Sequence, residues 1–220
     1  MSIRHAAVAA VVAALAGLAS ADVTSETQNF SFPLSPGGTT LNFAQFDTQG
    51  GTRELCKVSF SFDALIGANV TAENDSTLPA PNFAINLSGF ITIDVGNPAV
   101  LSGFAGINQV AGAGVGPSDG VADSGPDFHD FGFLSDDASG MDMTTLLADF
   151  VQFIGAGTVP VDIDASAGFS VSGSTDSTIN VTDLAASGSV TITYEYKVVP
   201  APASVALLGL GGLVAGRRRR

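Results

Sequence analysis

An alternation of apolar and polar side chains with a period of two recurs along this chain and constrains its fold most. The longest such run covers Phe83 to Val95, with apolar side chains at nearly every odd position. The most regular run covers Val190 to Val198. A period of two is that of a strand with one buried face and one exposed face. The pattern therefore predicts that half-buried strands make up most of the fold.

Turn residues separate the alternating runs and indicate how the strands are joined. The chain has 26 Gly and 10 Pro, and it has 15 Phe but no Trp. We expect eight to ten short strands with no alternating βαβ units, which is typical of an all-β protein. The predicted fold is one antiparallel β-sandwich of jelly-roll or immunoglobulin-like kind, covering residues 22–198.

Three segments near the start of this domain carry local expectations. Residues 22–29 are polar and predict an irregular segment before the first strand. Residues 55–63 alternate and predict a strand, with 66–72 as its hairpin partner. Cys56 is the only cysteine, so no intramolecular disulfide can form, and its phase with Val58 predicts a buried thiol.

The middle of the chain is less regular. The Gly- and Asp-containing segment 112–125 predicts a long loop, and a Phe-rich piece beginning at Phe128 predicts a strand. Residues 142–154 show a helical phase through Leu146, Phe150 and Ile154, which favours a short helix. A strand at 150–154 is the alternative.

The first 21 residues have the three parts of a secretory signal peptide. Arg4 and His5 form a positive start, Ala6 to Leu18 is apolar, and Ala19 and Ala21 frame a small-x-small cleavage pattern. The apolar run is shorter than the roughly 20 residues of a membrane-spanning helix. We therefore expect signal peptidase to remove residues 1–21 during export.

Residues 199–220 form a tail of a different character. Pro200 and Pro202 end the last alternating run, residues 203–216 carry no charge, and four arginines follow at Arg217, Arg218, Arg219 and Arg220. An apolar segment with a basic end is typical of a helix that engages the inner membrane and keeps its positive end in the cytoplasm. The alternative is a helix docked on the protein's own core.

The tail resembles the PEP-CTERM sorting signal of Gram-negative-type bacteria. The resemblance is carried by Pro200, Ala201 and Pro202, then by the apolar residues 206–213, then by the basic end. It implies recognition by an exosortase, a membrane cysteine protease, and delivery to the cell surface or the extracellular polymeric matrix. Ala201 replaces the Glu of the family motif, which points to a variant enzyme or to a tail kept as an anchor.

The body resembles the choice-of-anchor E domain of secreted bacterial proteins. The matching stretches are 40–47, 50–52, 153–159 and 190–196. That family has no assigned activity, so the resemblance implies a β-rich surface domain and no catalytic residues.

The charge of the predicted domain excludes several kinds of partner. All 21 acidic residues lie within 22–198, whereas only Arg53, Lys57 and Lys197 are basic there, so the net charge is 3 − 21 = −18. So acidic a surface repels nucleic acid and anionic lipid. It suits a secreted protein or one that binds cations.

Few residues offer catalytic chemistry. His129 is the only histidine after the signal peptide, and no G-x-S-x-G motif is present, so we expect no enzyme. The best ligand hypothesis is a weak calcium site, because Asp119, Asp123, Asp127 and Asp130 gather in and beside a Gly-rich loop. Their spacing does not match an EF-hand, and no other cofactor is expected.

Together these features predict an exported, surface-sorted bacterial protein that is a structural or adhesive component of the envelope or extracellular matrix. Its expected partners are signal peptidase, an exosortase-type enzyme, the inner membrane and exopolysaccharide. The alternative function is a carbohydrate-binding module, stabilised by calcium. That function needs exposed aromatic side chains, whereas Tyr194 and Tyr196 are predicted to face the core.

Overall fold

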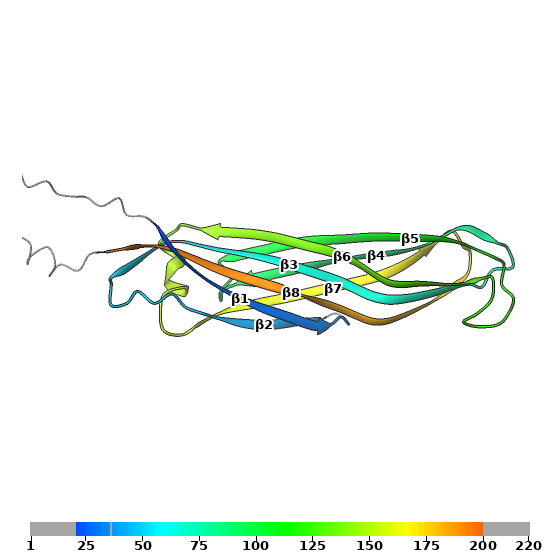
Figure 1. Ribbon diagram of the computed structural model, residues 1–220, viewed down its shortest axis with the longest axis horizontal. Helices are drawn as coiled ribbons and strands as arrows, with labels where there is room; N and C mark the ends of the chain where they lie inside the picture. The colour runs from blue at the N-terminus through cyan, green and yellow to red at the C-terminus, as the bar shows by residue number, and fades with distance from the viewer. Residues whose placement is uncertain (1–20, 36, 200–220) are drawn as a thin grey trace, which may run out of the picture.

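The computed structural model describes residues 21–35 and 37–199, and these form two antiparallel sheets of four strands each that pack face to face (Figure 1). The all-β sandwich predicted from the alternation is confirmed. The elements are β1 (Asp22–Pro33), β2 (Gly37–Ala44), β3 (Arg53–Asn74), β4 (Ala80–Val95), β5 (Leu101–Val115), β6 (Phe128–Thr144), the 3-10 helix η1 (Asp149–Gln152), β7 (Thr158–Ser172) and β8 (Ser177–Val198).

The strands are paired in a nested order. One sheet has the order β1-β8-β3-β6 and the other β2-β7-β4-β5. The first strand therefore pairs with the eighth, the second with the seventh, the third with the sixth and the fourth with the fifth. Most of these partners are far apart in sequence, so tertiary packing rather than local hairpin formation sets the arrangement.

The strands are longer than their sequence patterns suggest. β3 and β8 have 22 residues each, and β3 runs through both 55–63 and 66–72 without turning. The predicted hairpin between these two segments is therefore wrong. At least every second side chain of β3 is buried along most of its length, with shifts of register at two positions, so continuing the strand buries more apolar surface than reversing it would.

Three other local expectations need correction. The loop predicted for 112–125 begins only after β5 ends at Val115. Residues 22–29 belong to β1, which pairs with β8 from Asp22 opposite Tyr196 to Pro33 opposite Ala185. β1 is an edge strand with mostly exposed side chains, so its sequence lacks an apolar stripe. The region 142–154 starts as the end of β6 and contains only the four-residue η1, in which Phe150 is the buried residue.

Cys56 is exposed, not buried as predicted. Along β3, Leu55 lies opposite Tyr196 and Lys57 opposite Glu195, so Cys56 is the extra residue of a β-bulge. A bulge shifts the phase of a strand by one residue. Leu55 and Val58 consequently both face the core.

The core lies between the sheets and consists of two apolar clusters along the long axis. The larger includes Phe60 and Phe62, whose rings stack at 6.3 Å. The smaller surrounds Phe83 and Ile85. Gly103 of β5 and Gly140 of β6 make room for the Phe rings, since a Cβ on either would approach the Phe62 ring to 2.7 or 2.6 Å. These two glycines are thus required by packing.

Side chains from one sheet bind the edge strand of the other. On one side of the sandwich, Glu26 of β1 accepts the backbone N–H of Ala44, and Gln28 donates to the carbonyl of Asn42. On the other side, Asp142 and Asp136 of β6 accept the backbone N–H groups of Ser102 and Asn108 on β5, at 3.1 and 2.8 Å. These contacts occupy backbone groups of edge strands that could otherwise pair with another chain.

The domain is elongated, and both ends of the described chain lie at the same tip (Figure 1). β1 begins there and β8 ends there, beside η1. We call this tip the base. At the opposite tip, which we call the head, three loops meet: 75–79, 116–127 and 173–176.

Candidate functional site

The head is organised around Asn74, the last residue of β3. Its side chain is fully buried, and its Nδ2 donates to the carbonyls of Leu78 and Gly116 at 2.9 and 2.7 Å. Its Oδ1 accepts from the hydroxyl of Ser174 at 2.6 Å. One amide therefore ties all three head loops together, which sequence patterns did not reveal because Asn74 lies in an ordinary polar turn sequence.

Two carboxylates of the head face the same space. Asp119 and Asp127 each use one oxygen to accept a backbone N–H, from Val121 at 2.8 Å and from Asp119 at 3.0 Å respectively. A Cβ added to Gly125 would overlap Asp119 Oδ2 and would lie 2.9 Å from Asp127 Oδ1. The other two oxygens thus both lie within 2.9 Å of the position that a Cβ of residue 125 would take, which a glycine, here at a φ of +92°, leaves free for them.

The four predicted calcium ligands do not lie together in the structure. Asp119 and Asp127 come together, whereas Asp123 lies beside the buried Glu73, which accepts its backbone N–H at 3.1 Å. Asp130 accepts the N–H of Gly132. Within 21–35 and 37–199, no three His, Cys, Asp or Glu side chains gather as they would around a metal ion.

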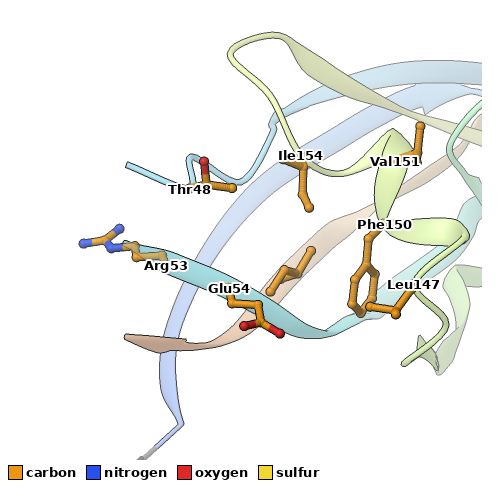
Figure 2. A pocket seen from close by; sticks show the side chains of 8 residues that line it. Thr48, Arg53, Glu54, Leu147, Phe150, Val151 and Ile154 are labelled. Atoms are coloured by element: carbon orange, nitrogen blue, oxygen red, sulfur yellow. The ribbon is translucent and has the colours of Figure 1, made fainter. Parts of the chain in front are cut away.

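The base carries an open apolar groove of about 380 Å³ (Figure 2). Leu147, Phe150, Val151 and Ile154 line one side, and the other is lined by Thr48, Arg53, Glu54 and Leu55. Leu147 and Val151 are each 77% exposed. Their segment, which showed a helical phase in the sequence, thus buries Phe150 and Phe153 and exposes Leu146, Leu147 and Val151 to solvent.

The Lys and Arg side chains of the domain lie on β3 and β8 toward the base, and Arg53 lines this groove. Lys57 forms an ion pair with Glu195 at 2.6 Å, and Lys197 forms one with Glu54 at 2.9 Å. The hydrogen bond to Glu54 raises the pKa of Lys197. The guanidinium carbon of Arg53 lies 4.9 Å from the centre of the Tyr196 ring. The Lys and Arg side chains of the domain are therefore concentrated toward the base.

A third surface is the outer face of the β2-β7-β4-β5 sheet. Phe90 of β4 and Phe104 of β5 stack there with ring centres 6.0 Å apart, and Phe104 is 69% exposed. Phe90 also borders a shallow groove with Gly38, Asp164 and Ser166. The sequence signal was Phe90 itself, an aromatic residue at a position that the alternation assigns to the solvent face.

The two tyrosines face the core, as predicted. The hydroxyl of Tyr194 donates to the carbonyl of Ala44 at 2.9 Å, and burial, with a contribution from Glu26, raises the pKa of Tyr194. His129 packs edge-on against Phe131 at 4.6 Å. No hydrogen bond joins His129 to a carboxylate among the described residues.

The predicted export and sorting residues fall mostly outside the described ranges. These are Ala19, Pro200, Ala201, Pro202 and Arg217 to Arg220, whereas Ala21 immediately precedes β1. Within 21–35 and 37–199, no helix is both long and apolar enough to cross a membrane.

No protein-family model and no curated protein matches this chain. Among solved structures, that of infectious bursal disease virus strain Gx is 13% identical with a TM-score of 0.26, covering 83% of this chain and 37% of that chain. The VP2 subviral particle of the same virus is 13% identical with a TM-score of 0.24, covering 90% and 50%. This chain thus spans half or less of the length of those chains. At such low TM-scores, no property of those proteins can be assigned to this chain.

Proposed function

We propose that this protein is a non-catalytic structural or adhesive component of a bacterial cell surface, exported through the inner membrane and displayed by its C-terminal tail. Its partners would be signal peptidase, an exosortase-type enzyme, the inner membrane and exopolysaccharide. The proposal joins the export and sorting features of residues 1–21 and 199–220 to the shape of the domain between them.

One observation carries the proposal: the residues next to both terminal segments lie at the base. Asp22 lies opposite Tyr196, and Val199 donates its N–H to the carbonyl of Thr52 at 2.8 Å. A chain held by residues 200–220 would therefore have its base toward the membrane and its head away from it. A 22-residue strand is roughly 70 Å long, so the head would stand well clear of the lipid.

The character of the two tips supports this orientation. Both tips expose apolar side chains and carry carboxylates, but all Lys and Arg side chains of the domain lie toward the base, whereas the head loops carry carboxylates without Lys or Arg. Anionic lipid attracts Lys and Arg side chains and repels a tip that carries carboxylates alone, so the base is the tip better suited to face a membrane.

Expression of the full chain in an exosortase-containing bacterium tests the proposal. We expect mass spectrometry of the surface fraction to find a new N-terminus at Asp22 and a C-terminus near Pro202. If Ala201 prevents cleavage, the intact tail should remain in the membrane fraction. Replacement of Arg217 to Arg220 by serine should reduce surface delivery. Full-length protein with its signal peptide in the cytoplasm would contradict the proposal.

We also infer that the sandwich is a jelly roll rather than an immunoglobulin-like fold. Eight strands in two sheets with nested pairing fit the double-sheet jelly roll, whereas the immunoglobulin fold divides seven or nine strands differently. Either fold is compatible with a display role.

The exposed Phe90 and Phe104 pair favours a second function, that of a carbohydrate-binding module. Sugar rings stack on exposed aromatic faces, and Asp164 and Ser166 could supply hydrogen bonds beside them. Binding of the full chain to a glycan array, lost in Phe104→Ala and kept in Phe133→Ala, would establish it. Phe133 is a suitable control because it is also exposed but lies on β6. If the array shows no glycan preference, the carbohydrate-binding function is rejected and the display role remains the proposal.

A further inference from the structure

We propose that the head binds a calcium ion between Asp119 and Asp127, with Asp127 Oδ1 and Asp119 Oδ2 as its two carboxylate ligands. This site is independent of the tail and of the proposed display role. Glu73, Asp123 and Asp130 are not ligands in this proposal.

The first argument is the state of Asp127. It is 0% exposed, and its Oδ1 has no hydrogen-bond partner. Among the described residues, only one other buried side-chain nitrogen or oxygen lacks a hydrogen-bond partner, and that atom is the neutral Asn86 Oδ1. A buried carboxylate oxygen without a partner is costly, so its presence points to a ligand.

The second argument is the direction of the free oxygens. Backbone N–H groups hold one oxygen of each carboxylate and orient both side chains, and the remaining oxygens border the space beside Gly125. Two carboxylates that share one space repel each other unless a cation lies between them. Asp119 is exposed whereas Asp127 is buried, so an ion would approach the two oxygens from the side of Asp119.

The third argument is the lack of a protein cation in the head. Arg53, Lys57 and Lys197 are the only Lys and Arg side chains of the domain, and all lie toward the base, so the one basic side chain near the head is His129, which packs against Phe131. Lys57 is 17 residues from the end of β3, which corresponds to roughly 55 Å of strand. No Lys, Arg or His side chain forms an ion pair or hydrogen bond with Asp127 among the described residues, so an ion from solution would supply its counter-charge.

Calcium fits these ligands best. It accepts six to eight oxygen ligands in flexible geometry, and water can complete the shell at the exposed side of the site. Magnesium demands stricter geometry and loses its own water reluctantly. Because only two carboxylates converge, we expect a dissociation constant of about 0.1–1 mM, the range of extracellular calcium modules.

Calorimetric titration of the full chain in detergent with CaCl2, after removal of metal with EGTA, tests the site. We expect one calcium per chain, with MgCl2 binding at least about tenfold more weakly. Asp127→Asn and Asp119→Asn should each weaken calcium binding at least about tenfold. Both variants can keep the hydrogen bond to the backbone N–H through their amide oxygen, so the loops should stay folded, which a circular-dichroism melt will verify.

Asp130→Asn is the matched control. It removes the same charge from the same tip, but the Asp130 side chain turns back to Gly132. We expect its calcium affinity to stay within about twofold of that of the unchanged chain. If all three variants weakened calcium binding equally, binding would depend only on the net charge of the head, and the proposal would be overturned. Absence of calcium binding at 10 mM, on the order of ten times the weakest expected constant, would also overturn it.

Discussion

At the scale of single residues, a glycine on β5 decides whether the larger core cluster packs. A Cβ on Gly103 would lie 2.7 Å from the Phe62 ring and 3.0 Å from the Phe60 ring, both buried. On the same strand, a Cβ on Gly106 would meet nothing closer than 3.8 Å. Two glycines three residues apart thus have different reasons to be there.

We expect Gly103→Ala to lower the free energy of unfolding by about 1–3 kcal/mol, because the methyl group overpacks the core. Gly106→Ala should change it by less than about 0.5 kcal/mol. Urea unfolding followed by circular dichroism measures both. Equal effects of the two substitutions would show that strand propensity, and not contact with the Phe rings, sets the cost.

The buried phenol of Tyr194 predicts a dependence of stability on alkaline pH. Its pKa is raised in the folded state, so above pH ~10 the unfolded chain releases a proton that the folded chain keeps. The contribution of Tyr194 to stability is therefore full below pH ~10 and falls by about 1.4 kcal/mol per pH unit above it.

Tyr194→Phe isolates this effect. At pH 7 the variant should be about 0.5–1.5 kcal/mol less stable, because the hydrogen bond to Ala44 is lost. Above pH ~10 the difference should shrink and then reverse. Urea unfolding of both proteins from pH 7 to 11 measures it, and a constant difference throughout would contradict the prediction.

At the scale of elements, the chain blocks sheet edges with side chains rather than with a further strand. Asp136 of β6 accepts the N–H of Asn108 on β5, which belongs to the other sheet. Its neighbour Asp137 is exposed, and no side-chain hydrogen bond of Asp137 is found among the described residues. Comparing Asp136 with Asp137 therefore distinguishes the effect of the hydrogen bond to β5 from the effect of a negative charge at this edge.

Asp136→Ala should increase hydrogen exchange of the Asn108 amide by roughly 2- to 10-fold, since one hydrogen bond of about 0.5–1.5 kcal/mol is lost. Asp137→Ala removes the same charge and should leave that amide unchanged. Exchange measured by NMR or mass spectrometry compares the two. Faster exchange in both variants would attribute the effect to charge alone.

At the scale of the whole molecule, the proposed display role places the base of the domain toward the membrane. If the base faces lipid, Leu147 and Val151 add apolar contact to whatever the tail provides. Each buried aliphatic side chain is worth about 1.5–3 kcal/mol, so contact by both would strengthen membrane association at least tenfold.

We therefore expect Leu147→Ser with Val151→Ser to reduce the fraction of full chain that floats with neutral phospholipid vesicles. Leu78→Ser with Val121→Ser is the matched control, because both residues are exposed and lie in the head. Flotation should be unchanged in this control. An equal loss in both pairs would show that general hydrophobicity governs association.

Part of this molecule could be predicted from the sequence because the relevant forces act locally. The alternation through Phe83 to Val95 and Val190 to Val198 required half-buried strands, and the structure has them. Inward-facing Tyr194 and Tyr196 followed from the same phase. The role of the terminal segments remains a prediction from their sequence alone.

Tertiary structure decided what depends on distant contacts. The bulge that exposes Cys56, the pairing of polar β1 with β8 and the nested strand order all arise from partners far along the chain. The same holds for the head, where only folding showed that Asp119 and Asp127 share a space while Asp123 and Asp130 lie elsewhere. The local alternation of apolar and polar side chains predicts most of the buried positions. The packing of the two sheets decides which residues come into contact.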